Sequence, residues 1–173
     1  VRYDPILLNS KYNVDYHIRA FNKLCMMLNG YVSKMIVSFV DDYKNVRNNH
    51  LDYHEPSNEE YLTLKEAFEK NDIKVGSCME NKYHIGDKND CCVSIKYAFE
   101  RTGKLFKEWK ARDCHCVNMV DIGAYNSCLH GCKYCYANFD SKQIMSNYKM
   151  HDPKSSLLIG QLSFDDQIKV RRK

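Results

Sequence analysis

The stretch Met35-Ile-Val-Ser-Phe-Val40 is a nearly continuous apolar run of strand length. Runs of this kind are typical of parallel strands that are buried on both faces of a sheet. Shorter strand-like segments occur at residues 1–8 and 73–75. Because parallel strands need a crossover between them, and helices normally supply it, the spacing predicts an α/β fold with strands starting near residues 1, 34 and 73.

Helical periodicity fills the intervals between these strands. In the first interval the apolar residues recur at helical spacing, with Asn13 as the cap and Gly30 as the end: Val14, Ile18, Phe21, Leu24 and Leu28. In the second, Ser57 and Glu60 form a capping box before an apolar face of Tyr61, Leu64 and Phe68. Cys92, Ile95 and Phe99 predict one more helix, which ends near Gly103.

The resulting βαβαβα order predicts two regions of different character. Residues 1–103 contain three strand–helix units, too few to close a barrel but suited to the C-terminal part of a β/α barrel. From residue 104 to 173 regular periodicity fades, and we expect a Cys-rich, mostly irregular segment that binds metal and packs on the barrel part. The chain begins at Val1, and we expect a preceding N-terminal portion.

Composition narrows the class of protein. The chain has 173 residues, of which 44% are apolar, and nine cysteines. The odd cysteine number and the long helical patterns favour reduced thiols that bind metal in the cytoplasm over a disulfide scaffold. The net charge is +4, and the basic C-terminal tail favours a solvated end over a nucleic-acid surface. No apolar run is long enough to span a membrane.

Charged side chains follow or line the predicted strands. Arg2 and Asp4 are expected where the chain leaves the first strand, Asp41 follows the second and Glu80 follows the third. Since the C-terminal strand ends of a β/α barrel surround its active site, Asp4, Asp41 and Glu80 are candidate catalytic residues and Arg2 is a candidate cofactor-binding residue. The alternative is an Arg2–Asp4 ion pair that is purely structural, with Asp41 as a helix cap.

The loop Cys128-Leu-His-Gly-Cys132-Lys-Tyr-Cys135 has Cys-x-x-x-Cys-x-x-Cys spacing. It resembles the cysteine loop of radical S-adenosylmethionine (SAM) enzymes. The resemblance implies a 4Fe-4S cluster held by three thiolates, a fourth iron that binds SAM, and an external electron donor. Tyr136 and Asn138 flank the loop as candidate cofactor-binding residues, or as supports of the loop.

The remaining cysteines leave two alternatives open. Cys114 and Cys116 can share a structural zinc ion with Cys132 and Cys135, which would make the chain a non-catalytic zinc-stapled module that binds a partner or nucleic acid. They can instead serve a separate metal site, joined by Cys78 or Cys92. Each of Cys78 and Cys92 can also be a buried small hydrophobe. Cys25 is expected in the core, and Cys91 is not expected to be a ligand.

Seven stretches resemble one bacterial family of unassigned activity, domain of unknown function 1848. They are Arg2-Tyr-Asp-Pro-Ile6, Ser38-Phe-Val-Asp41, Cys78-Met-Glu80, Cys114-x-Cys116, residues 121–126, residues 128–138 and His151-Asp-Pro153. The family's Gly-x-Cys motif corresponds more loosely to residues 90–92. Its cysteine loop in turn resembles radical SAM proteins of the spore photoproduct lyase type. The resemblance implies an iron–sulfur protein and a small-molecule cofactor. A membrane partner is not expected, because the chain has no apolar run of spanning length.

Overall fold

The computed structural model describes residues 1–80, 82–87, 91–110 and 114–169. Contacts within the chain divide it into two compact units. Unit 1 contains residues 1–41 and 52–120, and unit 2 contains residues 42–51 and 121–173.

A three-stranded parallel sheet forms the centre of unit 1. Its strands β1 (Arg2–Ile6), β2 (Lys34–Phe39) and β3 (Lys74–Ser77) lie in the order β1-β2-β3. Tyr3 pairs with Val37, and Val37 pairs with Ser77. The sheet confirms the predicted α/β class and the three predicted strand positions. Arg2 and Asp4 lie within β1 and not beyond its end, which corrects their expected place after the first strand.

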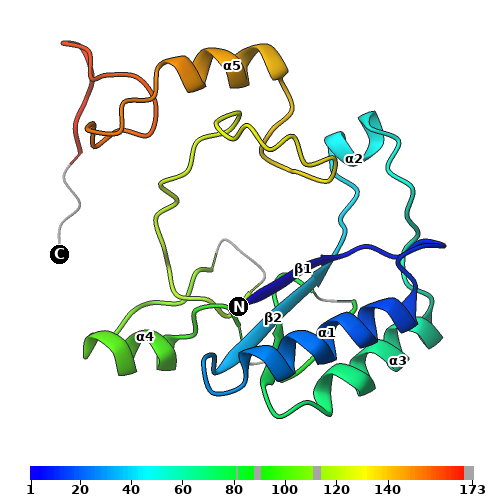
Figure 1. Ribbon diagram of the computed structural model, residues 1–173. Helices are drawn as coiled ribbons and strands as arrows, with labels where there is room; N and C mark the ends of the chain where they lie inside the picture. Colours follow the sequence, from blue (N-terminus) through cyan, green and yellow to red (C-terminus); the bar gives the residue numbers. More distant parts are fainter. Residues whose placement is uncertain (81, 88–90, 111–113, 170–173) are drawn as a thin grey trace. The chain divides into compact units, whose positions relative to one another are not determined.

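Two helices, α1 (Val14–Leu28) and α3 (Asn58–Glu69), pack against the same face of this sheet (Figure 1). The Asn13 side chain accepts a hydrogen bond from the Tyr16 backbone N–H at the start of α1. Ser57 and Glu60 form the predicted capping box at the start of α3. Tyr3 of β1 contacts rings from both helices, since it lies edge-on to Phe21 and to Phe68.

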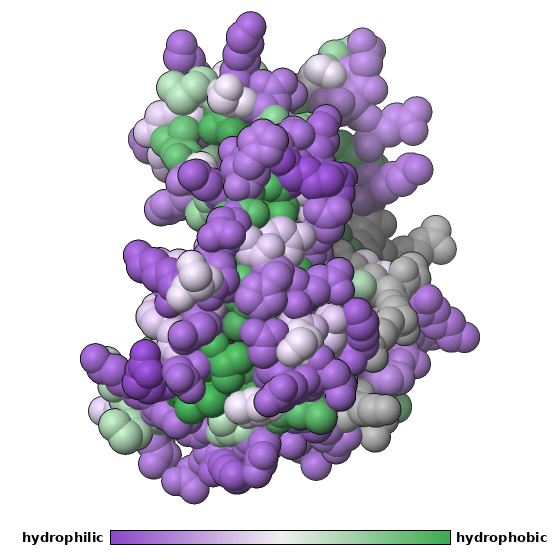
Figure 2. All heavy atoms as spheres, turned by 90° about the vertical axis from the view of Figure 1, so that its right-hand side faces the viewer, coloured by the Kyte–Doolittle hydropathy of each residue, from purple (hydrophilic) through white to green (hydrophobic). Residues whose placement is uncertain are grey.

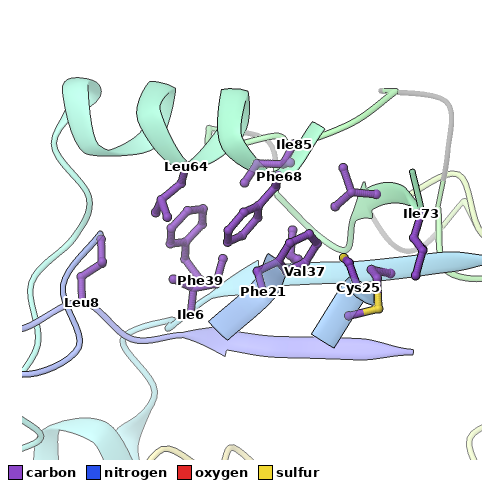
Figure 3. Packing of buried hydrophobic residues seen from close by; sticks show 12 residues of the cluster. Ile6, Leu8, Phe21, Cys25, Val37, Phe39, Leu64, Phe68, Ile73 and Ile85 are labelled. Atoms are coloured by element: carbon purple, nitrogen blue, oxygen red, sulfur yellow. The ribbon is translucent and has the colours of Figure 1, made fainter. Parts of the chain in front are cut away.

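The core of unit 1 lies between this face of the sheet and the two helices (Figure 3). Phe21 of α1 and Phe68 of α3 stack with their ring centroids 3.9 Å apart, and both are fully buried. Cys25 of α1 belongs to the cluster, as expected. Residues from all three strands complete it: Ile6, Met35, Val37, Phe39 and Val75. Burying large apolar side chains in this way supplies the main stabilising free energy of a small domain.

Helix α4 (Ile95–Thr102) is shorter at its start than the sequence predicted. The Ser94 hydroxyl accepts a hydrogen bond from the Tyr97 N–H and caps the helix, so Cys92 lies before the helix and not on it. Gly103 ends the helix as predicted, in the left-handed conformation at φ 66°. A glycine at that position avoids the steric cost of a Cβ atom.

Unit 2 contains α2 (Lys44–Asn48) and α5 (Ser141–Lys149), with turns and loops elsewhere among its described residues. Neither helix was predicted, because the apolar periodicity of both is short. The Asp140 side chain caps α5 by accepting hydrogen bonds from the Lys142 and Gln143 N–H groups. Within the described part of unit 2, Val46 is the one buried apolar side chain, and four asparagines are the buried polar ones.

On the face drawn in Figure 2 most side chains are hydrophilic, with apolar ones lying between them. Such a mixture is usual for protein surfaces. Among the described residues, the helices are all too short or too polar to cross a lipid bilayer.

Candidate functional site

The face of the sheet that α1 and α3 leave uncovered carries a polar cluster in unit 1. Successive strand residues point to opposite faces, so Arg2 and Asp4 lie opposite the buried ring of Tyr3. The Arg2 guanidinium forms an ion pair with the Asp4 carboxylate, and its Nε donates a hydrogen bond to Asp4 Oδ2 at 2.7 Å. The Asp4 side chain is 18% exposed and that of Arg2 is 50% exposed. The expected ion pair is therefore present, and it lies beside further candidate residues.

Glu80 is held at the end of the neighbouring strand β2. One of its carboxyl oxygens accepts a hydrogen bond from the Phe39 backbone N–H at 2.5 Å. Burial, together with the smaller effect of the nearby negative charges of Asp41 and Asp4, raises the pKa of Glu80 to about 7, although the Phe39 hydrogen bond acts in the opposite direction. A carboxyl group with this pKa exchanges a proton near neutral pH.

Two of the predicted carboxylates act on the third. Asp4 of β1 and Asp41, which follows β2, both raise the pKa of Glu80. The alternative role of Asp41 as a helix cap is wrong, because Tyr43 occupies the N-cap position of α2 and no side chain caps that helix. The carboxylates fit a polar site at one end of the sheet.

Cys78 and Cys92 meet beside this carboxylate cluster. Their thiol groups hydrogen-bond each other, and Arg2 Nη1 donates a hydrogen bond to Cys92 Sγ at 3.1 Å. The hydrogen bond from Cys92, with help from Arg2, lowers the pKa of Cys78 to about 6, whereas the same contact raises the pKa of Cys92. Both cysteines are partly exposed, and neither belongs to the apolar core cluster of unit 1.

Three further cysteines of unit 1 form a second thiol group. Cys116 hydrogen-bonds the thiols of both Cys91 and Cys114. Burial raises the pKa of Cys91 to about 12, with a smaller effect of Cys116. Sequence reasoning missed Cys91, because a helix that began near residue 92 would have turned it away. The start of α4 at Ile95 leaves Cys91 and Cys92 in a loop, where they point to different partners.

The loop of Cys128, Cys132 and Cys135 lies in unit 2. Cys128 and Cys132 are exposed, and Cys135 is half-buried. The Cys135 N–H donates to the Cys132 carbonyl at 3.0 Å, and the Ala137 N–H donates to Cys135 Sγ at 3.4 Å. The loop thus has an ordered backbone at its C-terminal end and presents two sulfurs to solvent.

Four buried asparagines hold this loop in place: Asn45, Asn126, Asn138 and Asn147. Asn126 Oδ1 accepts hydrogen bonds from the backbone N–H groups of residues 139 and 140, at 2.8 and 3.1 Å. Asn138 Nδ2 donates to the Cys128 carbonyl at 2.5 Å, and Asn45 Nδ2 donates to the Cys135 carbonyl at 2.7 Å. Asn147 Nδ2 donates to the Asn126 carbonyl at 3.0 Å. The side chains thereby satisfy backbone groups that a loop leaves unpaired.

From the sequence, Asn138 was expected to flank the cysteine loop, either as a cofactor-binding residue or as a support. Asn138 supports the loop, one of its two expected roles. Tyr136 is 62% exposed, and its ring lies 5.8 Å from that of Tyr43 and 6.3 Å from that of Tyr125. It therefore lies in an exposed aromatic group beside Cys135, where a ligand can reach it.

Among the residues that the structure describes in the two units, no three His, Cys, Asp or Glu side chains are arranged to hold a single metal ion. Cys128, Cys132 and Cys135 nevertheless supply three soft thiolate donors from one loop. Thiolates are the type of ligand that binds iron–sulfur clusters and zinc.

A family model described as Domain of unknown function (DUF1848) matches residues 1–137. No curated protein and no solved structure matches the chain.

Proposed function

The chain belongs to the DUF1848 family, and we propose that it is an iron–sulfur protein, a radical SAM-type enzyme of the cytoplasm. In this proposal Cys128, Cys132 and Cys135 hold a 4Fe-4S cluster. When bound, such a cluster supplies an electron for the reductive cleavage of SAM, and it receives that electron from a donor protein or cofactor. Nine free thiols suit a reducing compartment.

The observation that carries the proposal is the way unit 2 is stabilised. Its described residues bury Val46 and four asparagines, so its apolar core is almost absent. Small units that cannot bury enough apolar surface depend on disulfides, metals or association. All nine cysteines are free. A cluster bound by the three thiolates would provide the missing stabilisation, because the free energy of metal binding becomes folding free energy.

The arrangement of the loop supports the same proposal. The asparagines fix the loop backbone through its carbonyl and N–H groups, and they leave Cys128 and Cys132 exposed. Because the loop backbone is held by hydrogen bonds and these cysteines are exposed, their side chains can turn toward a common metal centre without disturbing a packed core. Supporting hydrogen bonds around ligand residues are typical of metal sites.

Unit 1 supports the proposal through its fold and its carboxylates. Strands in the order β1-β2-β3 with both crossover helices on one face fit part of a β/α barrel, whereas a doubly wound sheet has helices on both faces. In a barrel the uncovered face would be the interior. Arg2 and Asp4 would then face cofactor or substrate, and Glu80 would donate or accept a proton near neutral pH.

Anaerobic purification of the full chain tests the proposal. We expect iron and inorganic sulfide, a broad visible absorbance, and an electron paramagnetic resonance signal of the reduced protein that changes when SAM is added. Cys132→Ser should abolish the SAM-dependent change. Cys25→Ser, which alters a buried core thiol, is the matched control and should retain it. Zinc without iron would favour the zinc-stapled module and would refute the proposal.

A further inference from the structure

A pair of thiols in unit 1 plays no part in the proposed function. Cys78 and Cys92 come from different loops, and their thiol groups hydrogen-bond each other. Neither forms a disulfide, and both are half-buried, so they lie outside the sealed core and within reach of a small molecule. Thiols in such contact already point toward each other, which is the condition for a disulfide between them.

Strand β2 anchors the backbone on both sides of this contact. The Cys78 N–H donates to the Val37 carbonyl at 3.1 Å and thereby continues the pairing of β3 with β2. Lys34 Nζ, at the start of β2, donates to the Cys91 carbonyl at 2.6 Å, directly before Cys92. Because one strand holds both segments, the two thiols stay together without a covalent link.

Arg2 lies against both sulfur atoms. Its Nη1 donates a hydrogen bond to Cys92 Sγ at 3.1 Å, and its side chain also hydrogen-bonds Cys78. Asp4 fixes the guanidinium by accepting a hydrogen bond from its Nε at 2.7 Å. A neighbouring guanidinium stabilises a thiolate, which is the reactive form of cysteine. The hydrogen bonds from Cys92 and Arg2 accordingly lower the pKa of Cys78 to about 6, although burial acts in the opposite direction.

We propose that Cys78 and Cys92 are a reversible redox pair, which low-molecular-weight disulfides oxidise to an intramolecular disulfide. The contact between the two thiols and the position of Arg2 beside both sulfurs carry this inference. In a reducing compartment, protein disulfides are usually transient and serve redox sensing or catalysis. The inference concerns unit 1 alone and does not depend on the cluster proposed for unit 2.

The reaction is a two-step thiol–disulfide exchange. The Cys78 thiolate attacks one sulfur of the small disulfide, forms a mixed disulfide with it and expels the other sulfur as a thiolate. Cys92 then gives its proton to the expelled thiolate, and its own sulfur attacks the sulfur of Cys78 and expels the second thiolate. The two cysteines lose two electrons, and the small disulfide gains them and leaves as one thiol and one thiolate.

Arg2 suits Cys92 to the second step. In the reduced protein, the hydrogen bond to Cys78 and burial raise the pKa of Cys92, while Arg2 acts in the opposite direction. The mixed disulfide removes the negative charge of Cys78, so the guanidinium is left beside Cys92 to stabilise its thiolate. The same cation thus serves the two sulfurs in turn.

The other thiol contacts of unit 1 are less suited to start the exchange. Cys116 hydrogen-bonds Cys91 and Cys114, and burial raises the pKa of both partners. These two cysteines hold their protons at neutral pH, and a protonated thiol is a poor nucleophile. The reaction therefore begins at Cys78.

Anaerobic incubation of the full chain with mixtures of reduced and oxidised glutathione tests the pair. After the remaining thiols are alkylated, mass spectrometry of peptides should find a Cys78–Cys92 link that dithiothreitol removes. In Cys92→Ser the exchange should stop after its first step and leave glutathione bound to Cys78. In Cys78→Ser, glutathione should attach to Cys92 more than about tenfold more slowly than it attaches to Cys78 in Cys92→Ser, because the more reactive thiolate is gone.

Two further variants sharpen the test. The matched control Cys91→Ser changes the neighbour of Cys92 on the same loop and should keep the Cys78–Cys92 link. Arg2→Gln keeps both thiols and should slow formation of the link several-fold, which provides a readout if a cysteine variant does not fold.

The outcomes separate this inference from the proposed function. A pair that stays reduced in every glutathione mixture, links confined to Cys91, Cys114 and Cys116, or Cys92→Ser without glutathione on Cys78 would each overturn the redox pair. None of these results bears on the cluster of unit 2, which is followed by its iron content and its SAM-dependent signal. A chain that forms the Cys78–Cys92 link but binds no iron would refute the proposed function and leave the redox pair in place.

Discussion

Replacement of Glu80 by glutamine tests the electrostatics of the carboxylate cluster. Glutamine has nearly the same shape, and its carbonyl can still accept the hydrogen bond from the Phe39 N–H. The substitution removes only the ability to ionise. Any pH-dependent difference between Glu80→Gln and the unaltered chain therefore reports the free energy of holding that charge among Asp4, Asp41 and the thiol of Cys78.

The magnitude and its sign follow from the pKa. Folding raises the pKa of Glu80 from 4.5 to about 7, so the folded state holds the proton more tightly than the unfolded chain. Stability from this group is present at low pH and is lost as the pH rises through the window between those two values. The full shift corresponds to about 3 kcal/mol. Because Glu80 is only half-buried, solvent screening weakens the effect, and we expect ionisation of Glu80 to lower the free energy of unfolding by about 1–2 kcal/mol.

Urea unfolding of both proteins measures the effect. We expect Glu80→Gln to be more stable than the unaltered chain by about 1–2 kcal/mol at a pH of about 8, and nearly equal to it at a pH of about 5. Glu66→Gln, at a fully exposed position on α3, is the control and should show no comparable pH-dependent gain. A constant difference between Glu80→Gln and the unaltered chain across this pH range would refute the reasoning.

Two further substitutions test the backbone of unit 1 and the loop of unit 2. Gly86→Ala should destabilise the chain by roughly 3 kcal/mol or more, because φ is +87° and a Cβ would lie 2.1 Å from the Val75 carbonyl oxygen. The control Gly30→Ala, at φ +80° but in open space, should cost only about 1 kcal/mol. Equal decreases in melting temperature for the two variants would contradict this account. Asn126→Gly removes the side-chain oxygen that accepts hydrogen bonds from two backbone N–H groups in unit 2, so the iron bound per chain should fall. The control Asn9→Gly removes an oxygen that accepts the same number of hydrogen bonds in unit 1, and this variant should keep the iron.

The sheet and its helices were predictable because burial leaves a pattern in the sequence. Residues 35–40 are nearly all apolar because β2 is the central strand and most of its side chains are buried, and the helical spacing of Phe21 with its neighbours marks the face of α1 that packs on the sheet. The capping box at Ser57 was readable because it depends on two residues at fixed spacing. These features are local, so one sequence is sufficient to find them.

The pairing of the cysteines was not predictable in the same way. Cys78 contacts Cys92 across the end of β3, and Cys116 reaches Cys91 because its own backbone bridges to Ser94, a residue far from Cys116 in sequence. Such contacts depend on the tertiary fold and leave no periodic signal. The capping signal at Ser94 was the available clue, because a helix that begins at Ile95 frees both adjacent cysteines from it.

Unit 2 shows why composition alone did not reveal which side chains form the interior at the end of the chain. Its interior is made of amide side chains that hydrogen-bond a loop, and polar residues of this kind read as irregular surface in a sequence. The hydrogen bonds of these amide side chains also decide which substitutions unit 2 tolerates. In an apolar core a change of similar volume is usually mild. An Asn45→Asp change also preserves volume, but a carboxylate cannot donate to the Cys135 carbonyl, and it would bring a negative charge beside oxygens that need a donor. The loop should therefore depend on the chemical identity of its asparagines more than on their size.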